Sequence, residues 1–275
     1  MKSLYLAIGI NEFMHLPQAT LKGCVNDAKD MAVFFKERFG DSRGTVLLND
    51  YASKLSIEAV MRRMAQNCVD DPGIEVVNIS VSSHGCQVPD VDGDEDDGID
   101  EAVVVADTQI TDEIVRETVI TDDEWKYMLL MFPRTIVVNV FLDTCFSGDG
   151  IRLVGGNFSS RYLPNPIGLP MKKRILSNRW VIPAGKFKLL SHGLEENVCL
   201  LSGCDETETS ADAEIDGRYN GAMTRAFLEC TEIRLCRNQT AAAMRRWLRK
   251  NDFEQHPQLE GSRVLLREPY YDEVS

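Results

Sequence analysis

The chain has 275 residues, of which 44% are hydrophobic and 27% charged, so it is long and apolar enough to bury a sizeable core. Its formal net charge of −13 argues against a sequence-independent nucleic-acid binder, which needs a basic face to displace counterions. The apolar run before Asn11 is short for a signal peptide, and no run approaches the roughly 18 residues that span a bilayer. We therefore expect one domain over residues 1–275, located in the cytoplasm, that binds neither nucleic acid nor membrane.

Apolar runs bounded by turn residues alternate with segments of helical period, which is typical of a wound α/β sheet. The pattern predicts a mostly parallel sheet of about six strands flanked by helices. The expected strands are residues 3–10, 44–48, 74–82, 135–142, 197–202 and 262–266. The expected helices are residues 26–39, 56–68, 121–132, 219–230 and 240–250, the third starting at a Thr-x-x-Glu capping box.

Two segments interrupt this alternation. Residues 90–124 hold fifteen Asp or Glu and a single Arg, so this acidic segment alone accounts for the net charge and the rest of the chain is close to neutral. Residues 146–195 are rich in glycine and proline and have no regular pattern, which predicts a long irregular loop. Loops of that length usually have a function of their own.

Polar residues at the carboxyl ends of two expected core strands are the first candidates for chemistry, because ligands bind at that edge of an open α/β sheet. One strand is followed by His84 and Gly85, and the next by Cys145. A thiolate at Cys145 and an imidazole at His84 can act as nucleophile and proton donor. The backbone N–H groups of Gly85 and Cys145 can form an oxyanion hole. A single cysteine after a strand is more often buried and inert, so the pairing with His84 is what favours catalysis.

Nine segments, in order along nearly the whole chain, resemble the metacaspases and their bacterial caspase-like relatives, the orthocaspases. They are LAIGIN (6–11), LKGCVNDA (21–28), SSHG (82–85), DGDEDDGIDEA (92–102), TDDE (121–124), LDTCFSG (142–148), SGCDETETSAD (202–212), GAMTRAF (221–227) and HPQLEGS (256–262). The resemblance implies a caspase-like three-layer sandwich and a Cys/His dyad at the positions of Cys145 and His84. It also implies a monomer that cleaves proteins or peptides after arginine or lysine. Phe146 departs from the His that many eukaryotic members have there and is similar to the bacterial branch.

The resemblance further assigns four residues to the pocket for the side chain before the cleaved bond: Cys24, Asp27, Ser82 and Asp143. Two carboxylates that converge on one pocket favour a guanidinium, which can satisfy both with charge-assisted bonds. An aspartate-specific pocket would need arginine at such positions. The alternative for Asp27 is a structural one, since an acid in the first turn of a helix is favoured by the helix dipole.

The acidic segment invites a calcium interpretation, because hard oxygen ligands crowd one stretch. It is not an EF-hand, since Glu95 stands at the sixth position, where the sharp turn needs glycine. The resemblance implies a different calcium site at Asp100, Asp122 and Asp123, with Arg152 at the place of a fourth acid. The alternative is a solvated loop whose acids cap a helix. The peptidase chemistry itself requires no cofactor.

An enzyme that cleaves after basic residues can also cleave itself. The bases of the 146–195 loop include Arg152, Arg161, Lys172, Lys173, Arg174 and Arg179. We therefore expect a zymogen that processes itself within this loop. Two other functions stay open: a catalytically silent caspase-like module that binds proteins, and a nucleotide-binding α/β domain, although the chain has neither a GxGxxG nor a GxxxxGK[ST] motif.

Overall fold

A six-stranded sheet forms the centre of the molecule. The computed structural model describes residues 1–91, 98–146, 158–166, 196–203, 210–232 and 235–271. The strand order is β12-β9-β7-β3-β1-β2, and only the edge strand β12 runs antiparallel to its neighbour. The strands are β1 (Lys2–Gly9), β2 (Asp41–Leu48), β3 (Ile74–Ser82), β7 (Val137–Asp143), β9 (Val198–Ser202) and β12 (Gln258–Gly261). The expected mostly parallel sheet of about six strands is confirmed.

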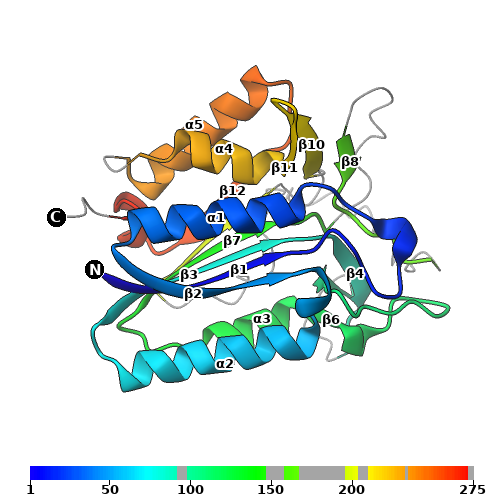
Figure 1. Ribbon diagram of the computed structural model, residues 1–275, viewed down its shortest axis with the longest axis horizontal. Coiled ribbons are helices and arrows are strands. Elements are labelled where there is room, and N and C mark those ends of the chain that lie inside the picture. The colour runs from blue at the N-terminus through cyan, green and yellow to red at the C-terminus, as the bar shows by residue number, and fades with distance from the viewer. Residues whose placement is uncertain (92–97, 147–157, 167–195, 204–209, 233–234, 272–275) are drawn as a thin grey trace, which may run out of the picture.

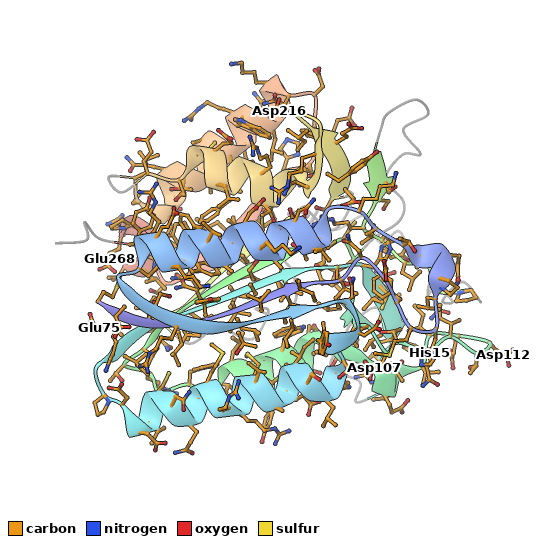
Figure 2. All side chains as sticks on the ribbon, in the orientation of Figure 1. His15, Glu75, Asp107, Asp112, Asp216 and Glu268 are labelled. Atoms are coloured by element: carbon orange, nitrogen blue, oxygen red, sulfur yellow. The ribbon has the colours of Figure 1, made fainter. Side chains whose placement is uncertain are left out.

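Helices cover both faces of this sheet and give three layers (Figure 1). On one face lie α1 (Cys24–Arg38), α4 (Ala222–Cys230) and α5 (Arg237–Lys250); on the other lie α2 (Lys54–Asp70) and α3 (Asp122–Leu129). Successive side chains of a strand point to opposite faces, so β1 supplies both cores. Leu6 and Ile8 pack in the core that contains α2, and Tyr5 and Ala7 in the core that contains α1 and α4. Side chains fill both spaces between the layers (Figure 2). None of the described helices is both long and apolar enough to cross a membrane.

A buried polar pair fixes the register of the two central strands. Asn78 of β3 stands opposite Asn139 of β7, and Asn139 Nδ2 donates to Asn78 Oδ1 at 2.9 Å. Arg237 of α5 donates to Asn139 Oδ1 at 2.9 Å, so the pair is tied to the helix layer as well. If β3 slipped by one residue along β7, the two amides would separate and each side chain of β3 would turn to the opposite face of the sheet. The same register sets Ser82 opposite Asp143, where both strands end.

Two smaller sheets flank the carboxyl edge of the main sheet, and the sequence pattern did not predict them. One contains β4 (Gly85–Pro89), β5 (Ile99–Val104) and β6 (Val119–Thr121), which are built largely from the acidic segment. The other contains β8 (Phe158–Ser160), β10 (Ala211–Ile215) and β11 (Arg218–Gly221). Both are antiparallel.

Three expectations are corrected. The strand expected at 262–266 is wrong: the edge strand is Gln258–Gly261, and Leu265–Arg267 forms a 3-10 helix that buries Leu265. The helix expected from residue 219 begins at Ala222, because Arg218–Gly221 pairs as β11. The 146–195 loop is not wholly irregular, since Phe158–Ser160 is a strand. Residues 147–157 and 167–195 of that loop lie outside the described residues.

Candidate active site

The two predicted catalytic residues lie on adjoining segments, which follow the ends of β3 and β7. Ser82 and Asp143 are paired in the sheet, and His84 and Cys145 each follow two residues later. A Cβ added at Gly85 would collide with the carbonyl oxygen of Cys145, so the turns after the two strands are in direct contact. Glycine is required there by this close approach. None of the cysteines in the described residues forms a disulfide.

The imidazole of His84 is held by a backbone carbonyl. His84 is 5% exposed, and its Nε2 lies 2.8 Å from the carbonyl oxygen of Ala19, in the 3-10 helix Pro17–Ala19. A carbonyl only accepts, so the hydrogen of the neutral ring is assigned to Nε2, and Nδ1 keeps the lone pair that can take a proton. Burial lowers the pKa of His84 to about 4, although the backbones of Ala19 and Arg161 act in the opposite direction. His15 and His256 are exposed, and Figure 2 shows His15 on the surface.

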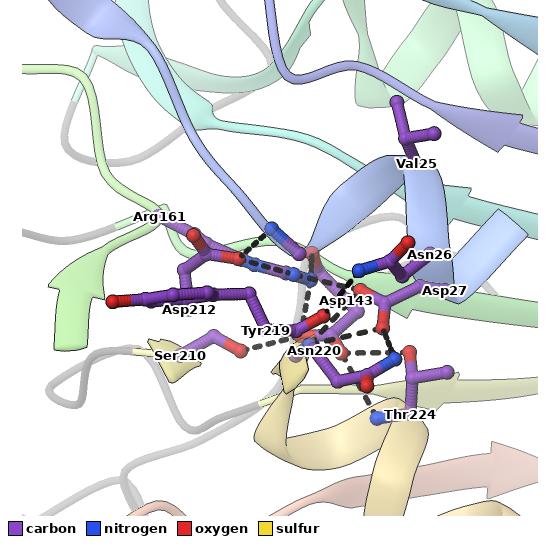
Figure 3. A network of polar contacts seen from close by, with 12 residues as sticks. Val25, Asn26, Asp27, Asp143, Arg161, Ser210, Asp212, Tyr219, Asn220 and Thr224 are labelled. Atoms are coloured by element: carbon purple, nitrogen blue, oxygen red, sulfur yellow. Dashed lines mark hydrogen bonds and ion pairs between the residues drawn. The ribbon is translucent and has the colours of Figure 1, made fainter. Parts of the chain in front are cut away.

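Three carboxylates surround the guanidinium of Arg161, and we call Asp27, Asp143 and Asp212 the acidic cluster (Figure 3). Arg161 Nη2 donates to Asp27 Oδ2 at 2.7 Å and to Asp212 Oδ1 at 3.0 Å. Arg161 Nη1 lies 3.1 Å from Asp143 Oδ1 and also donates to the carbonyl oxygen of Asp143 at 3.1 Å. Arg161 is fully buried. The two nitrogens of the fork thus contact different carboxylates.

Each carboxylate of the acidic cluster has further donors that hold it in place. Asp143 accepts bonds from the Thr224 backbone N–H and hydroxyl, at 2.9 and 2.7 Å, and from the Ser210 hydroxyl at 2.6 Å. Thr224 lies in the first turn of α4, where the helix dipole favours an anion. Asp27, in the first turn of α1, accepts from Asn220 at 2.9 Å and from the Gly221 N–H at 3.0 Å.

Burial and the charge partners within the cluster shift the pKa values of these groups in opposite directions. Burial raises the pKa of Asp27, and the adjacent Arg161 opposes this rise. Burial alone lowers the pKa of Arg161, but Asp143, Asp27 and Asp212 raise it overall, so the guanidinium stays charged. Burial raises the pKa of Cys24 well above its ordinary value, so this fully buried residue beside the cluster is a neutral thiol. A positive group is needed here, because unpaired buried carboxylates are strongly unfavourable.

The main chain around Arg161 is also bound. The Gly85 N–H donates to the carbonyl oxygen of Arg161 at 2.8 Å, and the Arg161 N–H donates to the carbonyl oxygen of Ser210 at 3.1 Å. The distance to Gly85 falls in the range expected for an oxyanion-hole donor. The predicted donor Gly85 therefore already faces a peptide carbonyl in this structure.

Among the predicted site residues, His84, Gly85 and Cys145 lie on the adjoining segments that follow β3 and β7. Asp27 and Asp143 converge on Arg161, as expected for a basic side chain. Ser82 is fully buried at the end of β3. Sequence reasoning assigned no role to Asp212 or to the Ala19 carbonyl. Asp212 is the last residue of the SGCDETETSAD segment, which made it part of the resemblance but gave it no role. A backbone carbonyl leaves no signal in the residue types.

One of the three predicted calcium ligands has a positively charged partner. Asp100 of β5 is 1% exposed and forms an ion pair with Arg116, whose guanidinium supplies the positive charge at this carboxylate. Burial raises the pKa of Asp100, Arg116 lowers it, and Asp90 and Asp123 add to the rise. Within the part of the chain that the structure describes, no three His, Cys, Asp or Glu side chains gather as metal ligands would. Calcium binding at these residues stays a prediction.

Comparison with known proteins supports the caspase-like architecture. The sequence model of the Caspase domain family matches residues 2–266. Metacaspase-1A of Aspergillus niger is 29% identical over 253 residues, which cover 81% of this chain and 61% of that protein. Metacaspase-1 of Emericella nidulans is 28% identical over 293 residues, which cover 94% of this chain and 70% of that protein. The chain thus spans less than two thirds of the length of the first of these relatives.

Two solved structures share the fold. A crystal structure of a Geobacter sulfurreducens protein has a TM-score of 0.68 at 23% identity and covers 99% of both chains. Caspase-1 from Spodoptera frugiperda has a TM-score of 0.56 at 14% identity, covering all of this chain and 91% of that one. The caspase-like fold expected from the nine segments is therefore confirmed.

Proposed function

Since the chain belongs to the Caspase domain family, we propose that it is a cysteine endopeptidase that cleaves peptide bonds after arginine or lysine. The observation that carries the proposal is the guanidinium of Arg161 on the acidic cluster, with the carbonyl of the same residue bonded to the Gly85 N–H. A substrate arginine held in this way presents its carbonyl carbon beside the turn that carries Cys145. The proposal includes a monomer that acts on proteins or peptides in the cytoplasm.

The proposed reaction is acyl transfer in two steps. His84 takes the proton of the Cys145 thiol through Nδ1, and the thiolate attacks the carbonyl carbon of the substrate. The Gly85 and Cys145 N–H groups stabilise the negative charge that develops on the carbonyl oxygen. His84 then gives its proton to the departing amine, and water hydrolyses the thioester to free the new carboxylate and Cys145. No step requires a cofactor.

The acidic cluster, with Cys24 and Ser82 beside it, is the proposed pocket for the basic side chain. A cation entering it satisfies carboxylates that are otherwise buried against one another, whereas an aspartate would add a further negative charge. Selectivity for basic over acidic residues follows from this charge difference. Self-processing within residues 146–195 also belongs to the proposal, because the same pocket accepts a basic residue of the chain itself.

Turnover of short fluorogenic peptides ending in Arg, Lys or Asp tests this function. The wild type and Arg161→Ala, which empties the acidic cluster, are expected to hydrolyse the Arg and Lys peptides but not the Asp peptide. Adding Cys145→Ala to either protein is expected to abolish turnover. Hydrolysis of the Asp peptide would overturn the proposed pocket. If neither the wild type nor Arg161→Ala hydrolyses any of the peptides, the result would instead favour the catalytically silent protein-binding module.

Calcium at Asp100, Asp122 and Asp123, which the family resemblance implies, has to compete with Arg116 for Asp100. Removing that competitor by Arg116→Gln is therefore expected to tighten calcium binding, measured by isothermal titration calorimetry on the Cys145→Ala protein. Asp123→Asn in the same background is the matched control and is expected to weaken binding. An unchanged affinity in Arg116→Gln would exclude Asp100 as a ligand, and no binding to any of the proteins would exclude the site.

A further inference from the structure

The segment 158–163 lies across the candidate active site in the manner of an extended peptide. Its first part, β8 (Phe158–Ser160), pairs antiparallel with β10, with Ser160 opposite Ala211 and Ser159 opposite Asp212. Its last part pairs with the first residue of β4, where the Leu163 N–H donates to the carbonyl oxygen of Gly85 at 2.8 Å. Adding a strand to an exposed sheet edge is a common way of binding a peptide.

Arg161 stands between these two parts and is bound through both its main chain and its side chain. Its N–H and carbonyl are bonded to Ser210 and Gly85, and its guanidinium contacts all three carboxylates of the acidic cluster. The side chain is fully buried although it comes from a segment rich in glycine and proline. Burying a guanidinium is costly unless paired carboxylates compensate for the lost hydration. The compensating groups here are the residues that we propose to bind a substrate's basic side chain.

The two serines just before Arg161 contribute little to this binding. Ser159 and Ser160 are exposed, while Arg161 is buried. Around Arg161 the segment is held by main-chain hydrogen bonds and by the Arg161 side chain, and beyond it Leu163 packs in the hydrophobic core. Any extended peptide with an arginine at the corresponding place could be held in the same manner.

We propose that residues 158–163 are the enzyme's own substrate and that the bond between Arg161 and Tyr162 is the one it cleaves in itself. This inference rests on the proposed function and names one bond within the 146–195 loop. Among the basic residues of that loop that the structure describes, Arg161 contacts the acidic cluster. The carbonyl of the same residue accepts the bond from the expected oxyanion-hole donor, so side chain and carbonyl agree on the position of the cleaved bond.

The step balances with groups of this chain and water. The Cys145 sulfur attacks the carbonyl carbon of Arg161, and the bond from that carbon to the Tyr162 nitrogen breaks. His84 passes the proton that it took from the thiol to the Tyr162 nitrogen, which becomes a new N-terminus. Water then hydrolyses the thioester, leaves a carboxylate on Arg161 and restores the Cys145 thiol.

Before cleavage, Arg161 keeps external substrates out of the acidic cluster. A tethered segment competes at a high effective concentration, so a free peptide has to displace a ligand that is always present. After cleavage, β8 is no longer continuous with residues 162–163 and can leave β10. Turnover of an Arg peptide is then expected to begin with a lag that has the same rate constant as the cleavage of the chain.

Intact-mass measurement and N-terminal sequencing of the incubated full-length protein test this bond. The wild type and Arg174→Ala, a matched change of another base in the loop, are expected to yield a fragment beginning at Tyr162. Cys145→Ala and Arg161→Ala are expected to stay whole. Tyr162→Pro, which keeps Arg161 but replaces the leaving amide by a tertiary one without an N–H, is also expected to stay whole. This variant keeps the test decisive if loss of Arg161 disturbs folding.

The rate of cleavage separates an intramolecular reaction from one between molecules. The proposal expects first-order cleavage that does not change with protein concentration, and a Cys145→Ala chain that stays whole beside active wild type. The proposal would be overturned by a fragment that begins at a residue other than Tyr162. It would also be overturned if the Cys145→Ala protein were cleaved when incubated by itself, or if the first-order rate constant of cleavage rose with protein concentration. If these results coincide with Cys145-dependent turnover of Arg peptides, the proposed function stands and only the self-cleaved bond is wrong. If that turnover is missing too, the proposed function fails.

Discussion

The tautomer of His84 depends on one carbonyl, and its low pKa depends on burial. In the unfolded chain the imidazole takes a proton near pH 6.5, whereas in the folded chain it does so near pH 4. Between these values the unfolded state binds more protons, so the free energy of unfolding falls as the pH is lowered from 6.5 toward 4. The shift corresponds to at most about 3 kcal/mol.

Urea unfolding of the Cys145→Ala protein at a series of pH values measures this effect. The His84→Gln variant in the same background is the control, because glutamine can still donate to Ala19 but does not titrate. The difference in unfolding free energy between the two proteins is expected to change across this pH window and to be constant above it. Parallel curves throughout would show that His84 titrates alike in both states.

We expect Asp212 to let the proposed pocket distinguish arginine from lysine. Arg161 reaches Asp143 with Nη1 and both Asp27 and Asp212 with Nη2. A lysine ends at about the position of the guanidinium carbon and cannot contact both sets directly. We predict that kcat/KM for an Arg peptide exceeds that for the matched Lys peptide by about tenfold or more in the Arg161→Ala background.

Asp212→Asn is expected to shrink this ratio, because the arginine loses a carboxylate partner that the lysine did not reach. The asparagine keeps an oxygen that can accept from the Gly23 N–H, which Asp212 Oδ1 does at 2.8 Å. Asp216→Asn, at an exposed acid, is the control for a change in overall charge. An equal fall in kcat/KM for both peptides would mean that Asp212 contributes only its negative charge to the site and does not select the guanidinium.

At the scale of residues, the place of a side chain in the fold could be predicted where it ends or follows an apolar strand. His84, Cys145 and Asp143 could be predicted because each ends a recognisable strand. Asp212 could not be assigned, because β10 is too polar to be recognised as a strand and its contact with Gly23 joins residues far apart in the chain. The burial of Arg161 depends on the same long-range contacts, so the sequence showed it only as one of several loop bases.

At the scale of elements, the capping box at the start of α3 is confirmed. The Thr121 hydroxyl accepts from the Glu124 N–H at 3.3 Å, and the Glu124 carboxylate accepts from the Thr121 N–H at 3.0 Å. Thr121→Ala leaves a backbone donor without its partner and is expected to destabilise the protein by about 1 kcal/mol. Chemical denaturation of the Cys145→Ala protein measures this. The exposed Thr111→Ala is the control, and an equal effect of both changes would contradict the role of the cap.

The elements that escaped prediction share a physical cause. β5 and β10 carry buried acids, Asp100 and Asp212, whose burial is made possible by an arginine from elsewhere in the chain. A pattern of residue types shows the acid but not its partner, so both strands looked like solvated loops. The error at residues 262–266 is similar in kind: the apolar Leu265 is buried from a 3-10 helix, while the half-buried Gln258–Gly261 pairs through its main chain.

At the scale of the whole molecule, the negative charge has two separate roles. The acidic segment forms much of the small sheet β4-β5-β6, where Arg116 neutralises the buried Asp100. The acidic cluster lies outside that segment and collects Asp27, Asp143 and Asp212 from α1, β7 and β10. Only folding of the entire chain brings these acids to one point, which is why nine short segments in the right order were a stronger guide to the family than any local pattern.

Covalent labelling with an arginyl chloromethyl ketone tests the nucleophile and the pocket together. In the Arg161→Ala protein the thiolate of Cys145 is expected to displace chloride and to form one thioether, located at Cys145 by peptide mapping in a mass spectrometer. The matched aspartyl reagent is expected to react far more slowly, and His84→Gln is expected to slow labelling by the arginyl reagent. Labelling of a different cysteine, or equal labelling by the aspartyl reagent, would contradict the assignment of an arginine-directed Cys145 peptidase.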